Sequence, residues 1–88
     1  MQRAMKHFAS PSFWIRYKKL PFKVQKLADK NFELLKINIE HPSLHLKRVR
    51  KFWSVRIGAT YRALGAEVEG DLLWFWIGTH ADYDKLIK

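Results

Sequence analysis

The chain has 88 residues, no cysteine, and 17 Lys and Arg against 8 Asp and Glu, for a formal charge of +9. This length predicts a single domain over residues 1–88, and the lack of cysteine excludes disulfides and cysteine-based zinc sites. The excess of positive charge favours a polyanionic partner, which is nucleic acid, the ribosome or an acidic protein segment.

Two helices are predicted in the first half of the chain. Ser10 followed by Pro11 is a helix-start signal, because serine caps a helix and proline fits its first position. Pro21 ends this helix, since the residue before a proline avoids the helical conformation. It also begins the second helix, over residues 22 to about 39, whose apolar residues recur at helical spacing. We expect His41 at the C-terminal end of that helix, where the helix dipole favours a cation.

The second half of the chain alternates apolar and polar residues, a pattern typical of half-buried strands. Residues 72–77 are apolar on both faces and therefore predict a central strand, which Gly78 ends. Residues 79–88 are expected to form a single helical turn or a tail, and residues 6–9 an added edge strand. The four predicted strands lie at residues 44–49, 53–57, 60–68 and 72–77.

No targeting or membrane signal stands out along the chain. The longest apolar stretch, Leu72 to Gly78, is far shorter than the roughly 20 residues that cross a bilayer. Residues 1–7 contain no apolar signal core. We therefore expect a cytoplasmic protein with no membrane partner.

The element order β-α-α-β-β-β-β predicts an α+β fold, in which an N-terminal helical hairpin packs on one face of a four- to five-stranded, mainly antiparallel sheet. Several short sequence motifs occur along this order of elements, and together the pattern covers the chain from about residue 6 to residue 87. They are Leu44-His45-Leu46-Lys47, Trp53-Ser54-Val55-Arg56-Ile57-Gly58, Tyr61-Arg62, Ile77-Gly78-Thr79-His80 and Tyr83-Asp84. In order and spacing these strings resemble the RelE/ParE superfamily of toxins.

The resemblance implies a toxin of a type II toxin–antitoxin pair, neutralised by a cognate antitoxin. RelE-like members enter the ribosomal A site and cut mRNA, whereas ParE-like members inhibit DNA gyrase. We favour the RelE-like activity, with mRNA and the ribosome as partners. Gyrase inhibition is the alternative, and a basic nucleic-acid-binding module without toxicity is the third interpretation. The toxin itself is expected to be a monomer or weak dimer that forms a higher assembly with its antitoxin.

Cutting RNA with its own 2′-hydroxyl requires an acid, a base, cations to stabilise the charged phosphorane, and a backbone held in line. His80 is the candidate acid or base, because only histidine has an unperturbed pKa near neutral pH and the resemblance places a catalytic histidine in this region. Arg56 and Arg62 are candidates for a phosphate clamp, since arginine offers two donors to one phosphate. Lys47 aligns with a family lysine that holds phosphate or acts as a base. Tyr83 is a candidate to orient the substrate, stack on a base or donate a proton.

Strand periodicity adds an orientation for the two arginines. Arg56 alternates with Val55 and Ile57, so it points to the open face if those two face the helices. Arg62 shares its parity with the apolar Leu64, so a bulge or turn near residues 58–60 is needed to bring it to the open face. General contacts with the RNA backbone are expected from the basic run of Arg48, Arg50 and Lys51.

The remaining aromatic and polar residues predict packing rather than a second site. Trp74 and Trp76 lie two residues apart and are expected to pack on one face of their strand. The sequence has no carboxylate cluster or histidine pair at ligand spacing, so we expect no metal and no cofactor. Asp82 and Asp84 depart from the more basic pattern of the resembled nucleases. Because acidic groups oppose a phosphate, we expect cleavage either to be weak or to rely on His80.

Overall fold

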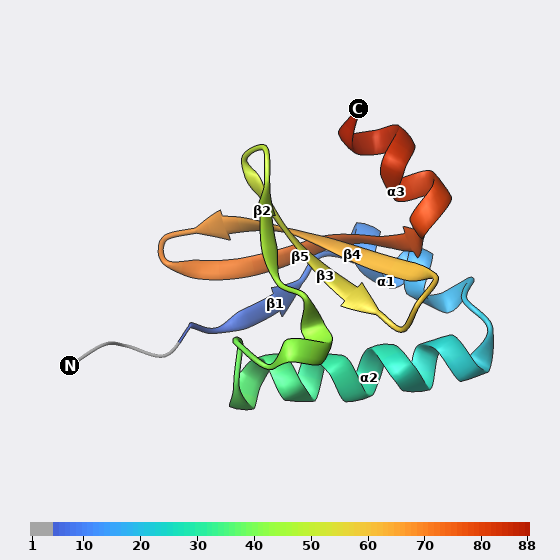
Figure 1. Cartoon of the computed structure of the whole chain (residues 1–88), viewed down its shortest axis with the longest axis horizontal. Coiled ribbons are helices and arrows are strands. Elements are labelled where there is room, and N and C mark those ends of the chain that lie inside the picture. The colour runs from blue at the N-terminus through green and yellow to red at the C-terminus, as the bar shows by residue number, and fades with distance from the viewer. Residues whose placement is uncertain (1–4) are drawn as a thin grey trace.

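The computed structural model describes residues 5–88, which form one five-stranded sheet flanked by helices (Figure 1). The strands lie in the order β1-β5-β4-β3-β2; β1 pairs parallel with β5, and the other neighbours are antiparallel. The predicted α+β fold is therefore confirmed. No helix among these residues is long and apolar enough to cross a membrane. The elements are β1 (His7–Ala9), α1 (Pro11–Lys18), α2 (Phe22–Ile37), the 3-10 turn η1 (Pro42–Leu44), β2 (Lys47–Val49), β3 (Phe52–Ile57), β4 (Tyr61–Val68), β5 (Asp71–Thr79) and α3 (His80–Ile87).

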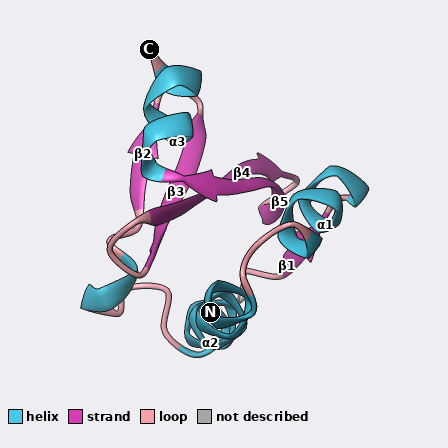
Figure 2. Cartoon of the chain, turned by 90° about the vertical axis from the view of Figure 1, so that its right-hand side faces the viewer, coloured by secondary structure: helices cyan, strands magenta, loops and turns pink. Residues whose placement is uncertain are grey.

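The sheet separates two apolar clusters. The larger one lies between the sheet and the hairpin of α1 and α2, and the smaller one lies beneath α3 on the opposite face. Figure 2 shows α2 and α3 on opposite sides of the sheet. Buried members of the larger cluster are Phe13, Ala28, Leu35, Leu44, Val55, Ile57, Ala63, Leu72, Trp74 and Ile77. Those of the smaller cluster are Leu64, Trp76 and Tyr83. Each face of the sheet is thus partly covered, and the α3 side carries the smaller buried cluster.

The predicted helix starts are confirmed, but the predicted end of the second helix is wrong. The Ser10 hydroxyl accepts the backbone N–H of Phe13, and Pro11 occupies the first position of α1. Helix α2 ends at Ile37, because Asn38 adopts an extended backbone with φ −152°. His41 therefore lies outside α2, where its ring nitrogen Nδ1 accepts the backbone N–H of Ser43 and caps η1.

Two strand boundaries also differ from the prediction. The strand expected over residues 44–49 is shorter, because Leu44 belongs to η1 and His45 adopts a left-handed backbone with φ 45° and ψ 45°. Strand β5 continues through Gly78 to Thr79. The hydroxyl of Thr79 then accepts the backbone N–H of Asp82, so the last segment is an eight-residue helix rather than a single turn or a tail.

A β-bulge in β5 overturns the expectation that Trp74 and Trp76 share one face. Leu64 pairs with Trp76 while the next residue, Gly65, pairs with Trp74, so Phe75 has no partner across β4. Trp74 consequently faces the helical hairpin, and Trp76 faces α3. The backbone carbonyl of Phe75 accepts a hydrogen bond from the hydroxyl of Ser12, a residue of α1. The bulge is therefore stabilised by the helix that packs against it.

Candidate functional site

Arg56 and Arg62 lie directly opposite each other on β3 and β4, on the face that the helical hairpin leaves open. Val55 and Ile57 are buried against the hairpin, so Arg56 points the other way, as predicted. Arg62 shares its face with Leu64 of the smaller cluster. The predicted turn is present at residues 58–60, between β3 and β4. It leaves the parity of Arg62 with Leu64 unchanged, and Arg62 reaches the open face because Leu64 lies on that face too.

This arginine pair is an unfavourable arrangement for a sheet without a bound anion. Like charges directly opposite each other destabilise neighbouring strands. Within residues 5–88, neither Arg56 nor Arg62 contacts a carboxylate. A phosphate placed between the two guanidinium groups would relieve the repulsion and accept several charge-assisted hydrogen bonds.

His45 extends the site on the β3 side, although the sequence offered no context for it. Nη1 of Arg56 lies 3.1 Å from Nε2 of His45. Because arginine is always a donor, Nε2 is the acceptor and the His45 proton resides on Nδ1. The buried Leu44 and partly buried Leu46 hold the segment on either side, while the exposed imidazole points away from the core. In the sequence, the one indication of this exposed position is that His45 stands between the two apolar residues Leu44 and Leu46.

His80 lies at the other end of the pair, as the first residue of α3. Its backbone N–H donates to the carbonyl of Thr60 over 2.7 Å, which fixes the start of α3 against the turn between β3 and β4. The imidazole is half-exposed and stacks on the ring of Tyr83, with ring centroids 6.0 Å apart. Nδ1 lies 3.4 Å from a carboxylate oxygen of Asp84. Asp84, expected only to oppose phosphate, is therefore placed to orient the imidazole of His80.

The guanidinium of Arg62 is attached to that same turn. Nη1 of Arg62 donates to the carbonyl of Tyr61 over 2.8 Å and lies 3.5 Å from that of Ala59. These hydrogen bonds hold the guanidinium of Arg62 near the end of the sheet at which α3 starts with His80. We call His45, Arg56, Arg62 and His80, in this spatial order, the histidine–arginine row.

Lys47 and Tyr83 differ in how they relate to this row. Lys47 pairs with Ser54 across β2 and β3, so it shares the face of Arg56 and is exposed at the edge of the sheet. Tyr83 is 3% exposed and packs against Trp76. Its hydroxyl is buried and makes no hydrogen bond within the described part of the chain. Tyr83 thus lies beneath His80 rather than on the open surface.

A sequence profile of the ParE-like toxin domain matches residues 22–85, from α2 to α3, which include the whole row. The chain belongs to the ParE-like toxin domain family. It is therefore a toxin of the RelE/ParE superfamily, of the type II toxin–antitoxin kind. A comparison with curated protein sequences found no match.

Two solved structures resemble the ParE-like toxin in fold. One is the RelB-RelE antitoxin-toxin complex from Methanococcus jannaschii, with a TM-score of 0.72 and 12% identity over 92% of this chain and 99% of that chain. The other is YafQ from E. coli strain BL21(DE3), with a TM-score of 0.63 and 15% identity over 90% of this chain and 97% of that chain. At these identities the likeness concerns the fold alone.

The basic run that follows β2 does not join the row. Arg48 lies opposite Trp53 on the other face of the sheet, where it contacts Glu67 at 3.4 Å and covers the Trp53 ring. Arg50, in the turn between β2 and β3, donates to the carbonyl of Ile87 at the end of α3. Lys51 lies over the ring of Phe52. The expected contacts of Arg48, Arg50 and Lys51 with RNA remain predictions, and Arg48 would have to act from the opposite face.

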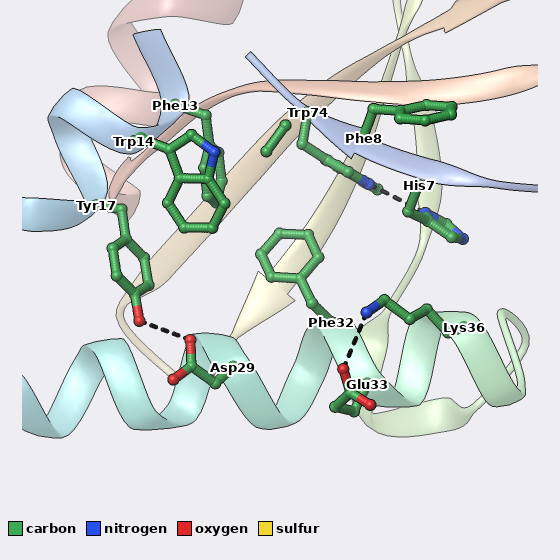
Figure 3. Close-up of a pocket in the computed structure, with 11 residues that line it drawn as sticks. His7, Phe8, Phe13, Trp14, Tyr17, Asp29, Phe32, Glu33, Lys36 and Trp74 are labelled. Atoms are coloured by element: carbon green, nitrogen blue, oxygen red, sulfur yellow. Dashed lines mark hydrogen bonds and ion pairs between the residues drawn. The ribbon is translucent and has the colours of Figure 1, made fainter. Parts of the chain in front are cut away.

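The ParE-like toxin also has a pocket of about 300 Å³ between β1, α1 and α2, on the hairpin side of the sheet (Figure 3). Its polar groups are already engaged: the hydroxyl of Tyr17 donates to Asp29 over 2.6 Å, and the indole N–H of Trp74 donates to Nδ1 of His7. The bond to Asp29 raises the pKa of Tyr17 to about 12. Burial, and secondarily Lys36, lowers the pKa of His7. The pocket is aromatic and includes carboxylates, so it suits a phosphate less well than the row does.

Proposed function

We propose that this toxin cuts mRNA at the ribosome by making the RNA 2′-hydroxyl attack the adjacent phosphate. The observation that carries the proposal is the histidine–arginine row, in which two histidines flank two arginines on one open face. Each group required by this chemistry, an acid, a base and cations at the phosphate, has a candidate within the row.

The roles follow from what each side chain contacts. Nε2 of His45 faces Arg56, so when Arg56 turns to the phosphate, this nitrogen is free to remove the proton of the 2′-hydroxyl. His80, whose imidazole Asp84 orients, gives a proton to the leaving 5′-oxygen. The 2′-oxygen bonds to phosphorus as the bond to the 5′-oxygen breaks, which yields a 2′,3′-cyclic phosphate and a 5′-hydroxyl. Arg56 and Arg62 stabilise the charge that develops on the phosphorane.

Lys47 and Tyr83 have supporting roles in this scheme. Lys47 holds a neighbouring phosphate, because it lies exposed on the same face at the edge of the sheet. Tyr83 is a positioning residue, since its buried ring supports the imidazole of His80. The tyrosine hydroxyl donates no proton to RNA in this scheme.

We propose a cognate antitoxin as the second partner, because one of the two structural relatives is an antitoxin–toxin complex. A chain of net charge +9 attracts an acidic segment as well as it attracts RNA. An antitoxin segment that folds as it covers the cationic row would exclude mRNA from it.

The test is to map mRNA 5′ ends by primer extension after incubation with translating ribosomes. The wild type is expected to create new ends within translated frames, and His80→Ala and His45→Ala each to reduce their yield by about 10²–10⁴-fold. His41→Asn is the control: it replaces a histidine outside the row, and asparagine also caps helices well. The proposal fails if the wild type creates no new ends, or if both alanine variants cut as well as the control.

Inhibition of DNA gyrase is the second candidate, because the matched family is described as ParE-like. Inhibition by binding needs neither acid nor base. A gyrase supercoiling assay with wild type and His80→Ala separates the two functions. Equal inhibition by both proteins, together with no mRNA cleavage, would support this second candidate.

A further inference from the structure

A second group of cations lies on the helical hairpin. Six of the 17 Lys and Arg fall within residues 16–30, where Asp29 is the only acidic residue. The carboxylate of Asp29 is already bonded to the hydroxyl of Tyr17. The six cations are Arg16, Lys18, Lys19, Lys23, Lys26 and Lys30.

Three of these lysines form a continuous stripe on α2. Lys23, Lys26 and Lys30 are spaced by three and four residues, so they share one side of the helix over roughly 10 Å. All three are exposed, whereas Ala28 and Leu35 on the opposite side of α2 are buried. We call Lys23, Lys26 and Lys30 the lysine stripe.

The end of α1 is held beside the stripe. The side-chain amide of Gln25, in α2, donates to the backbone carbonyls of Tyr17 and Leu20 over 3.0 and 3.2 Å. These bonds fasten the end of α1 to the first turns of α2. Lys18 and Lys19 therefore add to the positive charge at one end of the stripe.

The stripe has no anionic partner within residues 5–88. None of its three lysines forms an ion pair there, and the ammonium of Lys26 lies over the ring of Phe22 instead. Like charges three and four residues apart on a helix repel each other. Such a stripe becomes favourable when a row of external anions neutralises it.

We propose that the lysine stripe binds the phosphate backbone of structured RNA. Lysine is a point-charge ligand for phosphate, whereas the cores of protein–protein interfaces are depleted in lysine. Figures 1 and 2 show α2 and α3 on opposite sides of the sheet, so the stripe on α2 lies across the sheet from the histidine–arginine row. A single mRNA strand along the row would leave α2 uncovered, so the stripe requires a second, structured RNA, which the ribosome would supply. The inference rests on the proposed function in naming ribosomal RNA as this second RNA.

The test compares the binding of wild-type and variant toxin to purified 70S ribosomes across a salt series. K23Q/K26Q/K30Q removes the stripe and keeps residues that favour helix. K6Q/K36Q/K88Q removes the same net charge from scattered positions and is the matched control. We expect the affinity of the stripe variant for ribosomes at low salt to fall by a factor of roughly ten or more. The slope of the logarithm of its binding constant against the logarithm of the salt concentration should become shallower by about 1 per lysine lost. We expect the control to lose much less affinity.

The outcomes also separate this inference from the proposed function. Equal ribosome binding by the stripe variant and the control overturns the inference, whether or not the wild type cuts mRNA. A stripe variant that binds ribosomes normally but loses its complex with the protein encoded by the adjacent gene overturns it too, and assigns the stripe to an antitoxin. If the wild type cuts no mRNA but the stripe variant still loses ribosome affinity, the inference stands and the cleavage proposal fails.

Discussion

Replacing Tyr83 with phenylalanine separates a catalytic tyrosine from a packing one. The hydroxyl of Tyr83 is buried and has no hydrogen-bond partner in the described structure. Burying an unpaired hydroxyl costs about 1–3 kcal/mol in protein mutational data. The variant removes that cost and keeps the ring that packs against Trp76 and His80.

We expect Tyr83→Phe to stabilise the fold by about 1 kcal/mol, the low end of this range, because a small void replaces the hydroxyl. For a domain of this size, that change corresponds to a rise in Tm of about 4–8 °C. Tyr17→Phe is the matched control, since its hydroxyl makes a 2.6 Å hydrogen bond to Asp29. Loss of that bond should lower stability by about 0.5–1.5 kcal/mol. The two tyrosine variants should therefore shift Tm in opposite directions.

Thermal unfolding gives the stability, and mapping of mRNA 5′ ends gives the activity. Tyr83→Phe should cut like the wild type if Tyr83 only positions His80. If the Tyr83 hydroxyl instead donated a proton, its removal would lower the cleavage rate by a factor of about 10²–10⁴. A less stable Tyr83→Phe refutes the assignment of an unpaired hydroxyl, and a stable variant without cleavage refutes the assignment of a packing role.

Three further predictions concern the rest of the fold. Burial lowers the pKa of His7, so the unfolded chain binds this proton more readily than the folded one. The neutral His7 side chain therefore contributes its full stability above pH 6.5, and this contribution is lost as the pH falls below that value. When Tm is measured from pH 8 down to pH 5, it should decline more for the wild type than for His7→Asn. Gly78→Ala should cost about 1–3 kcal/mol by urea unfolding, because a Cβ would lie 2.6 Å from Cζ2 of the buried Trp76 ring, and an unchanged midpoint would contradict this packing. Asn31→Ala should cost about 1–3 kcal/mol in the same assay, since the buried amide donates over 2.7 Å to a backbone carbonyl of β3; a neutral effect would show that this bond is dispensable.

Local sequence signals predicted the order of elements and the orientation of single strands. Ser10 and Pro11 start α1 because capping and proline geometry act within one turn. The alternation through Val55 and Ile57 placed Arg56 on the open face, since side chains alternate along any strand. These features depend only on neighbours in the chain.

Features that depend on pairing between distant segments could not be predicted in this way. The bulge at Phe75 exists because β5 pairs with β4 in two registers and α1 supplies Ser12 to its carbonyl. That single irregularity reverses the alternation, which puts Trp74 and Trp76 on opposite faces. The contact of His45 with Arg56 likewise joins residues whose separation in sequence says nothing of their distance.

The sequence by itself determined an α+β fold, a strong positive charge, and a histidine and two arginines suited to phosphate chemistry. Only the tertiary structure showed that His45 completes the row and that Asp84 contacts His80. It also showed that Tyr83 is buried and that Arg48 faces away. The physical reason is that composition and periodicity specify which side chains a segment exposes. The strand register and the docking of α3 specify which of those side chains meet.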